Sequence, residues 1–175
     1  MRDAFIRRLT ALAAHEGCAY LRLDKSSAVS ALRAGEAFEL GRGRVLRDGD
    51  AVALIGCGGI VGELLDAADV LSSKGVECRV VSHHTVSSID EALIRNAAAQ
   101  TKGILTVEEH SVVGGLGSAI AEFCLEANLR PRHFRRLGLR NEFASVVGGQ
   151  AYLRKRYGMD STAVVHAVQT MLESD

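Results

Sequence analysis

The chain of 175 residues lacks several features that would identify a specialised class of protein. It has no tryptophan and a single proline, and only 5% of its residues are aromatic. Its 21 basic and 21 acidic side chains balance, so it exerts no long-range attraction on nucleic acid or on an anionic membrane surface. No apolar run approaches the ~18 residues that span a bilayer, and the charged N-terminal segment lacks the apolar centre of a signal peptide. We therefore expect a cytoplasmic protein that binds neither nucleic acid nor membrane.

The four cysteines show neither close pairing nor the spacing of a metal site. Cys18, Cys57, Cys78 and Cys124 each lie in or beside an apolar run, which predicts reduced cysteines in the core. Cys57 is the one thiol in a glycine loop near a predicted helix N-terminus, where a thiolate would be stabilised. No Cys-His or Ser-His-Asp arrangement with a recognisable nucleophile turn accompanies it.

Apolar residues make up 47% of the chain and follow the periods of strands and helices in turn. Short apolar runs predict strands at residues 44–47, 51–55, 76–82, 104–107 and 133–139. Helical spacing predicts helices at residues 61–74, 88–98, 118–127, 151–157 and from 161 onward. This alternation predicts an α/β fold, a three-layer α/β/α sandwich with a mostly parallel five-stranded sheet.

Several local signals refine this picture. Asp48 and Gly49 predict a tight turn that pairs the first two of these strands as a hairpin. Ser88 and Glu91 predict a capping box for the helix that follows them. The strand at 133–139 is rich in arginine, so we expect it at an edge of the sheet or facing a partner.

The N-terminal part of the chain reads as a separate unit. A helix is predicted over Ala4–His15 and a strand over Ala19–Leu23, and a stretch with little periodicity, Lys25–Gly43, then follows. One helix and one strand cannot bury both of their faces. We therefore predict that residues 1–24 are a remnant of a preceding domain or an arm that docks elsewhere, with a linker at 25–47 and the main domain at 48–175. Packing of the N-terminal elements on the same core remains the alternative.

Two glycine-rich loops each follow a predicted strand and open a predicted helix. The first contains Gly56, Gly58 and Gly59, and the second contains Gly114, Gly115 and Gly117. Backbone amides and the helix dipole in such loops can hold a phosphate. A dinucleotide site is not favoured, because the strand after the first loop ends in Ser-His-His without an acid for the ribose hydroxyls. Close packing of strand, helix and a neighbouring backbone explains the glycines as well.

Polar residues gather at the ends of two predicted strands. His83 and His84 follow one of them, and an acidic turn of Glu108, Glu109 and His110 follows the other. Such residues could bind a metal or share a proton, but neighbours on an extended chain point to opposite sides. A hydrogen-bonded His84 and carboxylates that cap the second glycine loop are therefore favoured. The candidates for an interface or an anion-binding loop are Gly56, Gly58, Gly59, His84, Glu108, Glu109, His110, Gly114, Gly115 and Gly117.

Residues 106–123, TVEEHSVVGGLGSAIAEF, resemble the glycine-loop signature of the C-terminal domain of the transketolase family. This signature is shared with the β subunits of 2-oxo-acid dehydrogenases and with deoxyxylulose-phosphate synthase. The segment YLRLDKS at 20–26 resembles the end of that family's pyrimidine-binding domain. Three further segments are similar to parts of its last domain: VLRDGDAVALIGCG at 45–58, HHTVSSID at 83–90 and LGLRNEFASVVGGQAYLRKRYGMD at 137–160. The likeness covers nearly the whole chain and is greatest to short or split-gene transketolases.

The resemblance implies that this chain is the C-terminal domain or subunit of a transketolase-like enzyme, which transfers two-carbon ketol units between sugars. In the family, thiamine diphosphate and magnesium are held by the diphosphate-binding and pyrimidine-binding domains, whose motifs are missing here; Asp48–Asp50 is only superficially similar. We therefore expect no catalytic, cofactor or metal residue in this chain, which would support assembly with chains carrying those domains in a homo- or hetero-oligomer. A free-standing phosphate-binding module and a scaffolding module remain alternatives.

Overall fold

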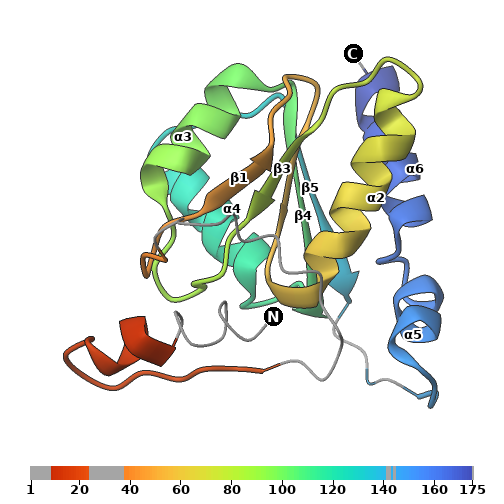
Figure 1. Cartoon of the computed structure of the whole chain (residues 1–175). Helices are drawn as coiled ribbons and strands as arrows, with labels where there is room; N and C mark the ends of the chain where they lie inside the picture. The colour runs from red at the N-terminus through yellow and green to blue at the C-terminus, as the bar shows by residue number, and fades with distance from the viewer. Residues whose placement is uncertain (1–8, 24–37, 141–142, 144, 175) are drawn as a thin grey trace.

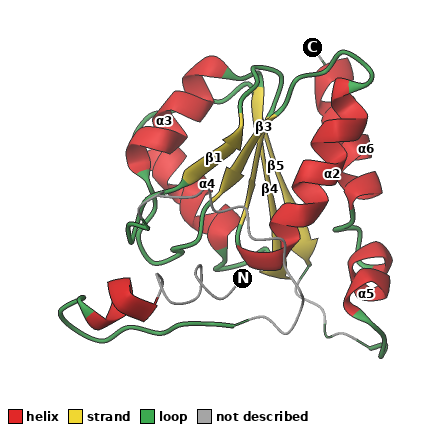
Figure 2. Cartoon of the chain, in the orientation of Figure 1, coloured by secondary structure: helices red, strands yellow, loops and turns green. Residues whose placement is uncertain are grey.

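The computed structural model describes residues 9–23, 38–140, 143 and 145–174 (Figure 1). A five-stranded sheet with the strand order β1-β3-β2-β4-β5 lies between two layers of helices (Figure 2). In chain order, the elements are β1 (Arg44–Arg47), β2 (Ala53–Gly56), η1 (Gly58–Ile60), α2 (Val61–Ser72), β3 (Arg79–Ser82), α3 (Glu91–Gln100), β4 (Gly103–Ser111), α4 (Leu116–Glu126), β5 (His133–Leu139), α5 (Gln150–Arg156) and α6 (Ser161–Glu173).

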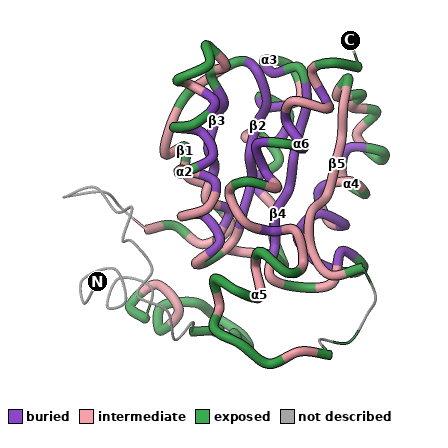
Figure 3. The backbone as a smooth tube through the Cα atoms, turned by 90° about the vertical axis from the view of Figure 1, so that its right-hand side faces the viewer, coloured by how far each residue is buried: buried purple, intermediate pink, exposed green. Residues whose placement is uncertain are grey.

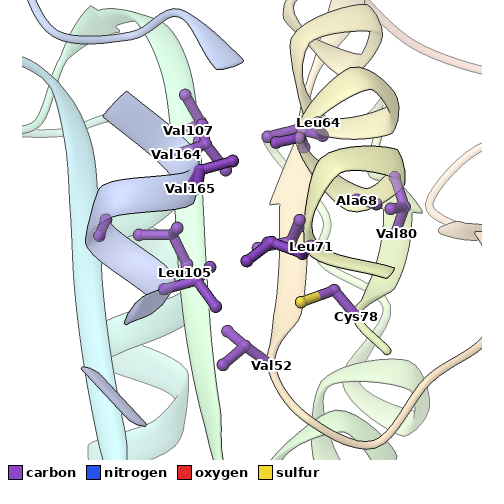
Figure 4. Close-up of a cluster of buried hydrophobic side chains, with 14 of the residues drawn as sticks. Val52, Leu64, Ala68, Leu71, Cys78, Val80, Leu105, Val107, Val164 and Val165 are labelled. Carbon is purple, nitrogen blue, oxygen red and sulfur yellow. The ribbon is translucent and has the colours of Figure 1, made fainter. Parts of the chain in front are cut away.

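The two faces of the sheet carry separate hydrophobic cores. Successive side chains on a strand point to opposite faces, so Leu54 of β2 packs with α2 and α6 while its neighbour Ile55 packs with α3 and α4. Figure 4 shows the first core, in which Leu64 and Leu71 of α2 face Val164 of α6. The three-layer α/β/α sandwich predicted from the sequence is therefore confirmed.

Four of the strands are parallel, so their carboxyl ends meet at one end of the sheet. β2 lies between β3 and β4 and is parallel to both, and β5 is parallel to β4. The helix after β2 packs on one face of the sheet, whereas the helix after β4 packs on the other. The carboxyl ends of β2 and β4 thus form a topological switch point, which is where open α/β sheets bind ligands. Both glycine loops lie there.

The predicted hairpin between residues 44–47 and 51–55 is wrong. β1 pairs antiparallel with β3, with Val45 opposite Val81, and β2 lies one strand further in. The turn carries the chain past the end of β3, where Gly49 packs against the backbone of Glu77 and Arg79 donates to Asp48 at 2.9 Å. β2 is buried on both faces, and a strand of that kind belongs at the centre of a sheet.

The N-terminal elements match the predictions less well. Residues 9–13 are helical, but the predicted strand Ala19–Leu23 is wrong, because residues 18–23 belong to no helix or strand. Residues 4–8 of the predicted helix and residues 25–37 of the predicted linker lie outside the described residues. β1 falls inside the segment 25–47 that we predicted to be linker, and it is a full member of the sheet.

Other ends of helices and strands also differ from the predicted ones or can be compared with them. The acidic turn predicted at 108–110 is strand, since β4 continues to Ser111. Asp90 rather than Ser88 caps α3, because its side chain accepts from the backbone N–H of Leu93 at 3.1 Å. Asn128, which follows the C-cap Ala127, has φ 55° and ends α4 in a left-handed conformation. The arginine-rich β5 is an edge strand as predicted.

Burial is uneven across the helices (Figure 3). α2, α3, α4 and α6 each bury several side chains, whereas α5 has no buried residue. Among the described residues, no helix is long and apolar enough to cross a membrane.

Candidate functional site

Glu108 caps the helix that follows the second glycine loop. Its carboxylate accepts from the backbone N–H of Leu116 at 2.8 Å and from that of Gly117 at 2.9 Å. Gly115 stands at the N-cap position and has no side chain that could do this, so a residue of β4 supplies the capping oxygens. Glu108 is buried, and its charge complements the positive end of the helix dipole. The predicted carboxylate cap is confirmed for Glu108.

The glycines of this loop make room for side chains of the same chain. A Cβ at Gly115 would collide with the carboxylate of Glu108, and one at Gly117 would lie 2.5 Å from the Thr106 hydroxyl. Gly114 has φ 76°, which favours glycine, and nothing lies within 4 Å of its absent Cβ. Close approach within the chain therefore accounts for Gly115 and Gly117.

Arg136 of β5 completes the loop, a role that no pattern in the sequence predicts. Its Nη1 donates to the carbonyl of Val112 at 2.8 Å and to the hydroxyl of Ser118 at 3.0 Å. The same hydroxyl accepts from the backbone N–H of Gly114 at 3.0 Å. The loop is thus held from both sides, by a carboxylate and by a guanidinium.

Glu109 points to the opposite side of the sheet from Glu108, as the alternation of strand side chains predicts. It accepts from Nε of Arg154 at 2.9 Å and from its Nη2 at 3.2 Å. Gln150 donates to the same carboxylate at 3.0 Å. The third guanidinium nitrogen of Arg154 donates to Glu63 of α2 at 3.2 Å.

This network attaches α5 to the rest of the domain. Burial by itself would lower the pKa of Arg154, but the hydrogen bonds and negative charges of Glu109 and Glu63 outweigh it and raise that pKa. Glu63 also accepts from the backbone N–H of Ser161 at 2.8 Å, at the start of α6. Because α5 buries no side chain of its own, these charge-assisted bonds fix its position. The roles of Arg154 and Glu63 could not be read from the sequence.

The three histidines near the strand ends do not converge. His84 stacks on Phe38 with ring centroids 4.2 Å apart, and its Nδ1 lies 2.9 Å from the Thr85 hydroxyl. His110 is exposed, and its Nδ1 donates to the Ser111 carbonyl. His83 is fully buried and accepts the backbone N–H of Asp90 on Nε2 at 2.9 Å. Desolvation lowers the pKa of His83, so the neutral ring that can accept this bond is favoured.

The first glycine loop is less constrained. A Cβ at Gly56 would lie 2.9 Å from Leu64 and 3.3 Å from the Val107 carbonyl, so this glycine lets β2, β4 and α2 pack closely. Gly58 has φ 79° and open space beside it. Gly59 lies in η1, and no side chain caps that turn or α2.

The thiols offer no reactive centre in the core. Cys78 and Cys124 are buried, and desolvation raises the pKa of Cys78 to about 11 and raises that of Cys124 as well. Cys57 is half-buried, and Cys18 is exposed, so the expected core position is wrong for Cys18. None of the four forms a disulfide within the part of the chain that the structure describes.

The described residues do not fit thiamine diphosphate with magnesium. No group of three His, Cys, Asp or Glu side chains among them is placed to hold a metal ion. In the turn that superficially resembles the family's metal motif, the Gly49 amide and the Arg79 guanidinium donate to the same oxygen of Asp48 and lower the pKa of its carboxyl group. A recess of about 410 Å³ lies beside the second glycine loop, and Glu122 lines it. The nearby N-terminus of α4 is already capped by the carboxylate of Glu108. Both carboxylates oppose an anion there.

Comparison with known proteins shows where this architecture recurs. Residues 41–164 match the family described as "Transketolase, C-terminal domain". A 6-deoxy-6-sulfo-D-fructose transketolase subunit of Clostridium sp. (strain MSTE9) is 38% identical over 160 residues, which are 91% of this chain and 49% of that protein. A 1-deoxy-D-xylulose-5-phosphate synthase of Syntrophus aciditrophicus is 36% identical over 88% of this chain and 24% of its own length.

A solved structure agrees with these relatives. A split-gene transketolase, described as an inactive β4 tetramer, superposes with a TM-score of 0.72 at 33% identity and covers 85% of this chain and 47% of its own. The chain spans about half the length of the first relatives it matches. The family match covers most of the chain, and the chain belongs to the transketolase family, in the part formed by that family's C-terminal domain.

Proposed function

We propose that this chain is a C-terminal subunit or domain of a transketolase-type enzyme, which transfers two-carbon ketol units between sugars and binds thiamine diphosphate and magnesium on its other domains. The observation that carries the proposal is the match of residues 41–164 to the family's C-terminal domain, together with the identity to split transketolase subunits. The relatives are about twice as long as the part that this chain matches.

In this proposal the chain supports assembly and is not catalytic alone. The acidic residues of β4 are committed to holding the fold: Glu108 to the start of α4 and Glu109 to Arg154. Residues 1–24 are then the end of a preceding domain or an arm, residues 25–43 a connection to it, and residues 44–175, which include β1, the main body of the C-terminal domain. The partners are chains that carry the diphosphate-binding and pyrimidine-binding domains.

Ketol transfer by the purified chain, alone and reconstituted, tests this proposal. The chain is incubated with thiamine diphosphate, magnesium, a ketose-phosphate donor and an aldose-phosphate acceptor, and product is measured. We expect no turnover from the chain alone, and turnover once a chain carrying the two missing domains is co-expressed with it. Turnover by the isolated chain would contradict the proposal, as would a partner chain that is equally active and equally stable without it.

A free-standing phosphate-binding module is the second candidate, favoured by the first glycine loop. Gly58 has a left-handed conformation with open space around it, and the helix behind it has no side-chain cap. Calorimetric titration with inorganic phosphate and sugar phosphates distinguishes the two functions. Binding tighter than millimolar that is lost in a Gly58→Val variant supports the module, whereas the subunit predicts none.

A further inference from the structure

β5 is the last strand of the sheet, and one side of its backbone faces away from the sheet. Among the described residues it pairs with β4 alone. Every residue of β5 is half-buried, whereas β2 at the centre of the sheet is buried throughout (Figure 3). The backbone N–H and C=O groups that point outward from such an edge can pair with an added strand. β5 is therefore open to an extended segment of another chain.

The edge carries positive charge that no acidic side chain of the described residues balances. Arg135 lies on β5, and the exposed Arg130 and Arg140 lie before and after the strand. None of the three arginines has a carboxylate within ion-pair distance among the described residues. Leu137 packs in the core under α2 and α6, and strand side chains alternate, so Arg135 shares that face of the sheet.

An apolar recess lies beside β5 on the opposite face, which we call the α4–β5 recess. It has a volume of about 380 Å³ and is lined by side chains that include Leu125, Leu129 and Phe134. Leu125 is apolar and yet 78% exposed. Arg130 lines the same recess. A strand placed beside β5 would direct every second side chain to this face, so the recess suits apolar residues at alternate positions.

We propose that the β5 edge binds an extended acidic segment of a partner protein, which adds to the sheet as a further strand. The apolar side chains of that segment enter the α4–β5 recess, and the glutamate or aspartate side chains between them meet Arg135 on the other face. In strand addition of this kind, main-chain hydrogen bonds supply affinity and alternating side chains supply specificity. The inference does not rest on the proposed enzymatic role.

The charge of the edge disfavours a second copy of this chain as the occupant. Pairing of two β5 strands would bring Arg135 and Arg136 of both copies together, and like charges on paired strands are destabilising. Arg136 is engaged with Val112 and Ser118 of the second glycine loop. Arg135 is therefore the arginine within β5 that is left to pair with an acidic partner.

Fluorescence anisotropy of a labelled peptide mixed with the full chain tests the proposal. The probe alternates glutamate and valine over 7 residues, the length of β5. We expect saturable binding, with a dissociation constant that rises about tenfold in Arg135→Glu and in Leu125→Ser. Lys74→Glu is the matched control, because it makes a similar change of charge at an exposed position after α2. It should leave the dissociation constant unchanged.

Two further probes separate strand addition from simple charge attraction. A peptide with lysine in place of glutamate should bind Arg135→Glu more tightly than it binds the parent chain, which would also show that the variant keeps its edge. Methylation of the peptide's backbone nitrogens at every second position blocks hydrogen bonding along one edge of the added strand only. Of the two alternately methylated peptides, one should lose binding and the other should keep it.

The same measurements can overturn the proposal. Absence of saturable binding by the parent chain would do so, as would equal binding of the two methylated peptides. Tighter binding of a single-stranded oligonucleotide than of the acidic peptide would assign the arginines to nucleic acid instead. A dimer in sedimentation velocity that the acidic peptide dissociates would assign the edge to a second copy, which is equally incompatible with the proposal.

Discussion

Replacing Glu108 by alanine should destabilise the domain more than any other single change at the second glycine loop. The variant leaves the backbone N–H groups of Leu116 and Gly117 without their acceptor in a buried setting. An unsatisfied buried donor costs about 1–3 kcal/mol, and loss of a helix cap costs about 1 kcal/mol. These effects overlap, because the cap consists of the same bonds, and water entering the vacated space offsets part of the loss. We expect a decrease of about 2–4 kcal/mol in the free energy of unfolding.

Urea unfolding followed by far-ultraviolet circular dichroism measures this change in a chain without tryptophan. With a slope of about 1–3 kcal/mol per molar for a domain of this size, the midpoint should fall by roughly 1–2 M at unchanged slope. Glu108→Gln retains one acceptor oxygen but loses the charge at the helix N-terminus. Its unfolding midpoint should therefore lie between those of the parent chain and Glu108→Ala.

Glu126→Ala is the matched control for this experiment. Glu126 is exposed and lies at the carboxyl end of the same helix, where a negative charge is unfavourable. Its removal should change stability by no more than about 0.5 kcal/mol. If Glu108→Ala were as stable as Glu126→Ala, the assignment of Glu108 as the internal cap of the glycine loop would be refuted.

Three further changes follow from the same contacts. Gly117→Ala should lower the midpoint of urea unfolding because its methyl group would strike the Thr106 hydroxyl, whereas Gly62→Ala, in a helix with open space around it, should stabilise by about 0.5–1 kcal/mol. Arg154→Met leaves two partly buried carboxylates without their cation and should lower the melting temperature by the equivalent of about 1–3 kcal/mol, while the exposed neighbour Lys155→Met should have little effect. Burial lowers the pKa of His83 in the folded chain below its usual 6.5. The stability that depends on the neutral ring is therefore complete above pH 6.5 and is lost as the pH falls from 6.5 toward the folded-state pKa, because the unfolded chain takes up a proton first. Unfolding free energies between pH 7.5 and 5 check this, since the fall should be reduced in His83→Gln.

The fold was largely predictable because its signals are local and repeated. The alternation of short apolar runs with helical spacing gives the order of β2, α2, β3, α3, β4, α4 and β5, and only an α/β sandwich with a parallel sheet fits it. Local sequence could not show which strand β1 pairs with, so the predicted hairpin was wrong. β1 and β2 adjoin in sequence, but the burial of β2 on both faces makes it a central strand.

The orientation of the site residues was predictable where it depends only on the alternation of side chains along one strand. Strand alternation required Glu108 and Glu109 to point apart, and they do. Sequence spacing could not predict that Arg136 would reach the carbonyl of Val112, or that Arg154 would reach across from α5 to Glu63. Such contacts join residues that are 24 and 91 positions apart, and they depend on how the helices pack.

Calorimetric titration of the isolated chain with thiamine diphosphate in the presence of magnesium tests the central claim most directly. The claim is that this chain is the assembly part of a transketolase-type enzyme and does not hold the cofactor. It predicts no saturable heat at millimolar cofactor from the chain alone, and stoichiometric binding once a chain carrying the two missing domains is present. Micromolar binding of thiamine diphosphate by the isolated chain would contradict it.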